Sequence, residues 1–261
     1  MDMALVCIAA LLAATLTLFS GFGLGTLLMP VFAAFFPLPM AVAATAVVHL
    51  ANNLFKLALV GSDANWRVAW RFGLPAAFAA FAGAASLQTV ALLPVLAEYR
   101  LGERSCQVTV LRVVMAVVIV GFAAYELHPR WSKAAFASKW LPWGGVISGF
   151  FGGLSGHQGA LRSAFLLRAG LTKEALIATG VVGAVIVDTA RLAVYGAGFY
   201  SEKFGLLDAR AWELVGPASV AAFIGSFFGA KLMEKVTLRK VQITVSVLLV
   251  CLAIALAAGV V

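Results

Sequence analysis

The residues that most constrain the fold of this chain run from Ser148 to Arg168, with the sequence S-G-F-F-G-G-L-S-G-H-Q-G-A-L-R-S-A-F-L-L-R. Apolar sequence surrounds this stretch, yet it contains five glycines together with His157, Gln158 and Arg162. Irregular backbone at membrane depth is tolerated only inside protein or beside a water-filled cavity, because unpaired N–H and C=O groups in hydrocarbon are costly. We therefore interpret the stretch as a broken helix that lines a site.

The second piece of this broken helix is predicted to begin at about Gly159. The first N–H groups of a helix have no intrahelical partner, and the helix dipole adds positive potential at the same end. Arg162 falls in the first turn, beside that end. Free N–H groups and a nearby guanidinium together favour a negatively charged ligand, so the sequence predicts an anion-binding site.

The composition indicates an all-α polytopic membrane protein. The chain is 63% hydrophobic and 11% charged, has a mean hydropathy of +1.02, and contains repeated apolar runs of membrane-spanning length. The net charge of +8 arises from Lys and Arg spread over loops, which does not favour nucleic-acid binding. Cys7, Cys106 and Cys251 lie far apart in the sequence, so we expect neither a disulfide nor a metal site.

The first half of the chain begins with a second predicted break. An apolar segment from about Met3 to Phe19 meets a glycine-rich run that includes Gly23 and Gly25. The apolar piece that follows, Thr26 to Phe36, is too short to cross about 30 Å of hydrocarbon at 1.5 Å per residue. This half is therefore also expected to open with a broken helical hairpin.

Three spanning helices are expected after each broken hairpin. The first of them carries a polar stripe on one helical face, which should face the protein interior. The stripe consists of His49, Asn52, Asn53 and Lys56. The six expected spans are Ala41–Val60, Pro75–Leu93 and Val108–Tyr125, then Ala175–Tyr195, Trp212–Ala230 and Val241–Val261. An amphipathic segment, Trp66–Arg71, is expected to be a separate interfacial anchor.

The two halves repeat each other in sequence. The run A-V-A-A-T at residues 41–45 recurs as A-L-I-A-T at residues 175–179, and Gly25 aligns with Gly159 at the same offset. The run that begins at Pro75 and ends at Gly83 recurs at residues 217–225. Paired glycine-interrupted segments at corresponding positions of two halves are typical of a transporter site.

The distribution of basic residues favours an inverted repeat. If each broken hairpin returns to its side of entry, one side of the membrane holds twelve of the 19 Lys and Arg residues. That side is then cytoplasmic, and both termini are periplasmic. The chain divides into a first transmembrane repeat over residues 1–127, a basic cytoplasmic linker over 128–140, and a second transmembrane repeat over 141–261.

Several of these motifs together resemble the sulfite exporter TauE/SafE family, also called the TSUP family. They are G-F-G-L-G-T-L-L-M-P at residues 21–30, P-M-A-V-A-A-T at residues 39–45 with its second copy, and the W-R that begins at Trp66. The resemblance implies a bacterial inner-membrane transporter of sulfite, thiosulfate or an organosulfonate such as sulfoacetate, with export as the expected direction. Typical members carry G-x-G-G-G in the second half, whereas residues 155–162 here read S-G-H-Q-G-A-L-R.

The leading hypothesis is a secondary transporter with a site between the two breaks at the bilayer midplane. The expected substrate-binding residues are Arg162, Gln158, His157, Gly159, Gly25, Gly23, Asn52 and Asn53. The expected coupling or gating residues are His49, Asp188 and Arg191, and protons are a candidate coupling ion. Asp188 and Arg191 are three residues apart on one helix, so either an internal ion pair or a contact with substrate fits the spacing.

Other function classes fit the sequence less well. A channel of the same architecture is one alternative, and an integral membrane enzyme or a membrane-embedded assembly factor are others. The sequence contains no H-E-x-x-H, G-x-S-x-G or G-x-x-x-x-G-K-[ST] motif, so we expect no catalytic residues, no metal and no cofactor. The expected partners are the anion and the lipid bilayer, with a homodimer as a further candidate and no nucleic acid.

Overall fold

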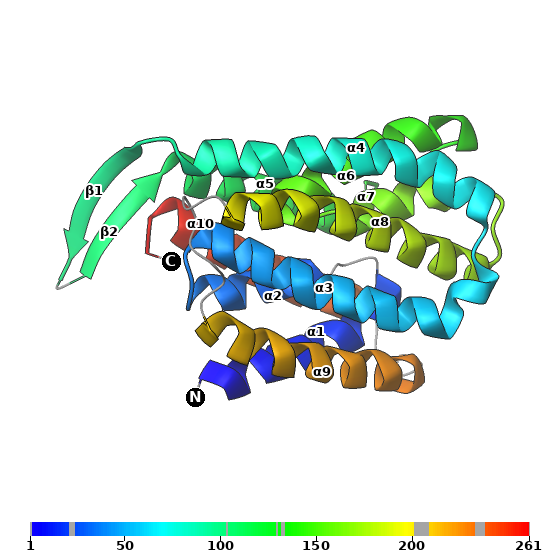
Figure 1. The fold of residues 1–261 in the computed structure, drawn as a ribbon, viewed down its shortest axis with the longest axis horizontal. Helices are drawn as coiled ribbons and strands as arrows, with labels where there is room; N and C mark the ends of the chain where they lie inside the picture. Colours follow the sequence, from blue (N-terminus) through cyan, green and yellow to red (C-terminus); the bar gives the residue numbers. More distant parts are fainter. Residues whose placement is uncertain are drawn as a thin grey trace.

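A computed structural model describes residues 2–20, 24–102, 104–128, 130–131, 134–200, 209–232 and 238–260 of the chain. Helices dominate the described residues (Figure 1). The first half contains α1 (Asp2–Ser20), α2 (Leu24–Ala33), α3 (Leu38–Val60), η1 (Gly61–Asp63), α4 (Trp66–Ala91), β1 (Val95–Leu101), β2 (Arg104–Thr109) and α5 (Val110–Leu127). The second contains η2 (Ser138–Trp140), α6 (Leu141–Ser155), α7 (Gly159–Leu166), α8 (Lys173–Tyr200), α9 (Ala209–Leu232) and α10 (Leu238–Ala257).

This order of elements matches the predicted scheme in both halves. A helix pair opens each half, α1 with α2 and α6 with α7, and three longer helices follow each pair. Helix α5 ends at Leu127 and helix α6 begins at Leu141, and the short helix η2 lies between them. With eight residues, α7 rises only about 12 Å and cannot cross a bilayer alone.

The two halves pack into each other rather than side by side. Helix α1 packs against α9, α4 against α6 and α8, α3 against α8 and α9, and α5 against α10. Gly83 of α4 lies against the backbone of α6 at Phe150, and Gly225 of α9 lies against the backbone of α1 at Leu11. These two glycines are the ones that the sequence repeat aligns, so each copy of the repeated sequence packs against the first helix of the other half.

A stripe of glycines brings α6 unusually close to α4. Gly145, Gly149 and Gly153 are spaced four residues apart, and a side chain on any of them would collide with the backbone of α4 between Phe72 and Ala80. Small residues at this spacing allow helix backbones to approach closely in membranes, where van der Waals packing is the main attraction between helices. Three of the glycines in this region therefore serve helix packing and not the break.

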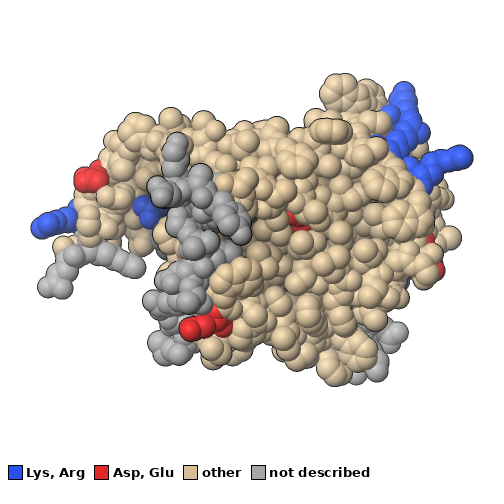
Figure 2. All heavy atoms as spheres, viewed as in Figure 1, with Lys and Arg blue, Asp and Glu red and all other residues tan. Residues whose placement is uncertain are grey.

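Helix length and surface charge both fit a membrane protein. Among the described residues, four helices are long and apolar enough to cross a bilayer: α3 with η1, α4, α5 and α8. The Lys and Arg side chains visible in Figure 2 lie toward the two ends of the molecule, and a broad band with few charged side chains separates them. Exposed apolar side chains in such a band contact lipid, so the chain is a multi-pass membrane protein.

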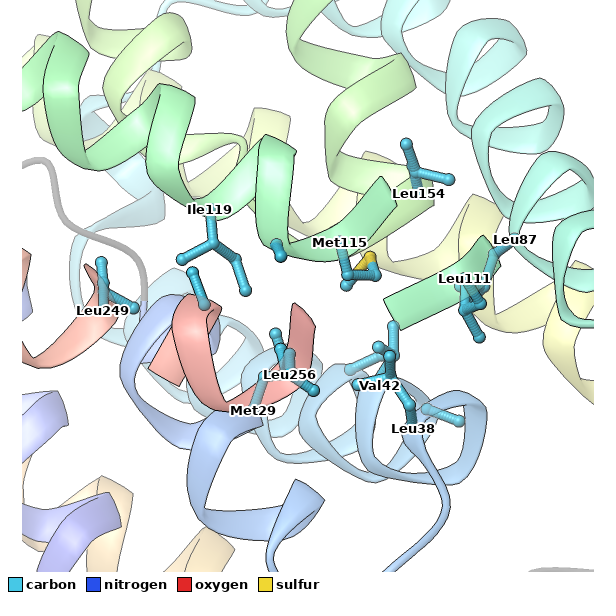
Figure 3. Close-up of a cluster of buried hydrophobic side chains, with 14 of the residues drawn as sticks. Met29, Leu38, Val42, Leu87, Leu111, Met115, Ile119, Leu154, Leu249 and Leu256 are labelled. Carbon is cyan, nitrogen blue, oxygen red and sulfur yellow. The ribbon is translucent and has the colours of Figure 1, made fainter. Parts of the chain in front are cut away.

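The largest apolar core joins the two halves. Met115 and Ile119 of α5 pack with Leu249 of α10, Met29 of α2 and Val42 of α3 (Figure 3). All five side chains are buried. Side chains from helices of both repeats thus close around one apolar cluster, to which Leu87 of α4 and Leu154 of α6 also belong.

The prediction of an all-α protein is wrong in one place. Strands β1 and β2 form an antiparallel hairpin that projects beyond the helix ends (Figure 1). Leu101 pairs with Arg104 across a two-residue loop that begins at Gly102, whose φ of 64° suits a tight hairpin turn. Every residue of β1 is exposed. No element was predicted between the expected spans Pro75–Leu93 and Val108–Tyr125.

The expected separate anchor at Trp66–Arg71 is also corrected. These residues form the first turns of α4, which continues through Pro75 to Ala91 without a break. The Asn65 side chain caps the helix by accepting a hydrogen bond from the Val68 N–H at 3.1 Å. Proline is tolerated inside membrane helices because neighbouring groups compensate for the lost hydrogen bond, so it does not mark a helix start here.

Candidate functional site

The break between α6 and α7 lies where the sequence predicted it. Helix α6 ends at Ser155, Gly156 adopts a left-handed conformation with a φ of 82°, and α7 begins at Gly159. A side chain would be strained at that φ, so the turn favours glycine. The Ser148 hydroxyl donates to the Gln158 carbonyl at 3.0 Å and ties the break to the preceding helix. No side-chain cap satisfies the first N–H groups of α7.

The first break approaches the second. A methyl group placed on Gly25, in the first turn of α2, would lie 3.6 Å from the Gly156 carbonyl oxygen. The same position is 3.6 Å from the Thr45 methyl group and 3.9 Å from the His49 ring. Gly23, also expected at the site, lies outside the described residues. Segments 130 residues apart in the sequence therefore meet at one place in the fold.

Asp188 of α8 is the centre of a buried polar cluster. Its side chain is fully buried and contacts residues of α3, α8 and the break. One carboxylate oxygen lies 2.6 Å from Nδ1 of His49 and accepts from Nδ2 of Asn53 at 3.2 Å. The other accepts from Nε2 of Gln158 at 3.2 Å and lies 2.8 Å from Nη2 of Arg191. Four of the predicted site residues thus converge on this carboxylate.

The spacing of Asp188 and Arg191 left two interpretations open, and the structure contains the ion pair. Arg191 is fully buried, and its Nη1 also donates to the Gly152 carbonyl at 3.3 Å. Gly156 lies against the same guanidinium, because a methyl group there would come within 2.9 Å of Nη1. Arg191 therefore supports the end of α6, and its charge is neutralised by Asp188 on the same helix.

Arg162 has a different environment. Its Nη1 donates to Oε1 of Gln158 at 3.2 Å, and its side chain passes Gly180 and Gly183 of α8. Among the described residues, no carboxylate lies within ion-pair distance of it. The side chain is only partly buried. The guanidinium is thus held in place by a neutral amide, with most of its donors left for another partner.

His157 lies at the break but faces away from Asp188. Its Nδ1 contacts the carbonyl and hydroxyl oxygens of Ser155 at 3.1 Å, and its ring stacks on Phe122 of α5 with centroids 5.4 Å apart. Among the described residues, its Nε2 is buried without a hydrogen-bond partner. The Thr45 hydroxyl, next to Gly25, is likewise buried without a partner. Unpaired buried groups of this kind are costly unless they serve another purpose.

Asn52 and Lys56 occupy the other side of the polar stripe on α3. With its amide oriented to satisfy its neighbours, Asn52 donates to Oγ of Ser226 on α9 and accepts from Nζ of Lys56, both close to 3 Å. Asn52 therefore does not reach the Asp188 cluster. The sequence interpretation left Lys56 and Ser226 out of the site, although Lys56 shares the helical face of His49 and Asn53.

Comparison with protein families identifies the chain. The model of the family described as sulfite exporter TauE/SafE matches residues 6–256, nearly the whole chain. The chain belongs to the TauE/SafE family. Comparisons with curated proteins and with solved structures each found no match.

Membership in the TauE/SafE family confirms the resemblance drawn from the sequence motifs. The family implies a membrane transporter of sulfur anions like sulfite, and not an enzyme. Such a transporter must hold an anion at membrane depth, where charged groups need compensation.

Proposed function

We propose that this chain is a secondary transporter which exports a small sulfur-containing anion across the bacterial inner membrane. The candidate substrates are sulfite, thiosulfate and an organosulfonate such as sulfoacetate. The anion binds between the two helix breaks, at a midplane site that opens alternately to each side. The observation that carries this proposal is the environment of Arg162, whose guanidinium lies beside the break with a neutral amide, Gln158, as its partner.

The proposal assigns different roles to the two arginines of the cluster. Arg191 is paired with Asp188 on its own helix and serves the architecture of the break. Arg162 keeps donors available, and an arginine fork binds planar or tetrahedral oxyanions through several parallel hydrogen bonds. Gln158 connects Arg162 to the Asp188–Arg191 pair, because its amide donates to Asp188 and accepts from Arg162.

Helix directions support the inverted arrangement on which alternating access would depend. His49 of α3 contacts Asp188, whereas Asn65, just beyond the end of α3, donates its N–H to the Thr179 hydroxyl at 3.0 Å. The contact residue moves from 49 to 65 on the α3 side while its partner moves from 188 to 179 on α8. Helix α3 and its counterpart α8 therefore run antiparallel. This is the relation that an inverted repeat requires. On this arrangement we place both termini in the periplasm.

Substitution of Arg162 tests the proposal. Arg162→Lys retains the charge but loses the fork, and Arg162→Gln loses both. A hydrogen bond to a charged group is worth about 1.5–3 kcal/mol, so Arg162→Gln should weaken sulfite binding by roughly 10- to 150-fold. Arg162→Lys should lie between the two. Binding is measured by titration calorimetry on purified protein in detergent, and transport by saturable uptake into proteoliposomes.

Arg67→Gln provides the matched control, because it removes the same charge from an exposed position on α4. It should bind sulfite as tightly as the wild type. If Arg162→Gln also binds with wild-type affinity, the anion site lies elsewhere. Flux that rises linearly with concentration and never saturates would favour a channel over a transporter.

A further inference from the structure

Lys56 is a buried cation on α3, the helix that packs against α8. Lys56 is seven residues before the end of the α3–η1 segment, a position from which a lysine usually extends its amine to the membrane surface. Instead, the residue is only 8% exposed, and its Nζ lies 3.2 Å from the side-chain oxygen of Asn52 in the favoured amide orientation. Within the described part of the chain, no carboxylate lies within ion-pair distance of it.

The antiparallel packing of α3 and α8 places Lys56 at the level of Arg162. Asn53 of α3 contacts Asp188, and Asn65, just after the α3–η1 segment, contacts Thr179. Lys56 therefore lies alongside the α8 residues between these two contacts. Gly180 and Gly183 belong to that stretch, and they are the residues that flank the Arg162 side chain.

The local charge is unbalanced. Lys56, Arg162 and Arg191 contribute three positive charges, and Asp188 contributes one negative charge. Arg191 and Asp188 neutralise each other, which leaves two positive charges on separate helices. Charged groups within membrane segments are expensive and usually mark the path of a substrate or ion. Two like charges near each other add repulsion that a bound anion would remove.

We propose that Lys56 and Arg162 together bind a doubly charged anion, each cation compensating one negative charge. This inference rests on the proposed function and specifies the charge of its substrate. Two glycines on the facing stretch of α8 leave that helix without side chains beside Arg162. Asn52 keeps the Lys56 amine in position through its amide oxygen, and Ser226 in turn holds the Asn52 amide. Asn52 is therefore a positioning residue in this proposal.

The test compares anions of different charge on wild-type protein and on Lys56→Met. Methionine has a length similar to that of lysine, but it carries no charge and no N–H or O–H group. Sulfoacetate carries a sulfonate and a carboxylate, whereas methanesulfonate carries a sulfonate alone. Wild-type protein should bind sulfoacetate at least about 10-fold more tightly than methanesulfonate, which corresponds to one additional charge interaction. In Lys56→Met this preference should disappear, because the affinity for sulfoacetate should fall about 10-fold more than the affinity for methanesulfonate.

Two further variants keep the result interpretable. Lys56→Arg retains the charge and should keep much of the preference for the dianion, even if its bulk alters the affinity. Lys139→Met removes an exposed amine and should behave as wild type. If Lys56→Met weakens both ligands equally, or changes neither, the two-cation site is refuted. If wild-type protein binds no sulfur anion at all, the proposed function itself fails, which is a distinguishable outcome.

Discussion

Asp188→Asn should destabilise the protein strongly even in the absence of substrate. The carboxylate is fully buried and receives donors on both oxygens. Asparagine presents one acceptor oxygen and one NH₂ group that only donates. If its oxygen faces Arg191, its NH₂ group faces His49 and Asn53; in the opposite orientation, the NH₂ group faces Arg191. Neither orientation restores the charge that balances the Arg191 guanidinium.

The expected cost follows from the ion pair. Removing one partner of a buried ion pair costs about 3–5 kcal/mol, because the remaining charge is left uncompensated. That is a large part of a typical folding free energy of about 5–15 kcal/mol. Arg191→Met removes the other charge, and the double variant leaves no orphaned cation. The double variant should therefore be less destabilised than the sum of the single variants, with a coupling of about 2–3 kcal/mol.

The assay is unfolding in mixed detergent micelles, followed by tryptophan fluorescence, with all four members of the cycle measured at the same detergent ratio. Asp63→Asn is the matched control, because it makes the same change at an exposed position in η1. It should shift the unfolding midpoint very little. If Asp188→Asn is as stable as wild type, or if the two single effects simply add, then Arg191 does not depend on Asp188 and the charge argument is wrong.

Three further predictions concern packing, the breaks and orientation. Gly149→Ala should lower the free energy of unfolding in detergent by about 1–3 kcal/mol, because the methyl group pushes α6 away from α4. Gly121→Ala is the control and should be neutral, because nothing lies within 4 Å of its new methyl group. Equal effects of the two variants would refute the packing role. Gly25→Leu should abolish uptake in folded protein while Gly25→Ala retains it, since its methyl group meets only ordinary contacts; uptake by both variants would contradict this. Cysteine at Arg130 should resist, and cysteine at Arg100 accept, impermeant labelling from outside intact cells, and the reverse pattern would overturn the orientation.

The order of helices and the second break could be predicted from local signals. Glycine clusters, apolar run lengths and the repeated A-x-x-A-T motif are properties of neighbouring residues, and they place α7 at Gly159 as observed. The face shared by His49, Asn53 and Lys56 follows from helical spacing alone. The partner of the Lys56 amine, the amide oxygen of Asn52, lies one turn earlier on the same helix.

The contacts between halves could not be predicted, because they depend on how distant helices pack. Nothing in the sequence around Asn52 points to Ser226, which lies 174 residues away. The same holds for the meeting of Gly25 with Gly156. Glycines also look alike in sequence, although Gly149 fits α6 against α4 and Gly156 forms the turn of the break. The roles of these glycines can be distinguished only when the backbone that each one packs against is known.

The Asp188 cluster constrains how such a transporter could move. His49 and Asn53 belong to the first repeat, whereas Asp188, Arg191 and Gln158 belong to the second, so the bonds at this carboxylate join the two halves. A rotation of one repeat against the other must either carry the cluster as a rigid pivot or exchange these bonds for others. An arriving anion that draws Arg162 toward itself competes for Gln158, which also donates to Asp188. If Arg162 binds the anion as we propose, substrate binding and the contact between repeats are coupled through the Gln158 amide. Gln158→Leu should then uncouple them, leaving anion binding measurable while transport is lost.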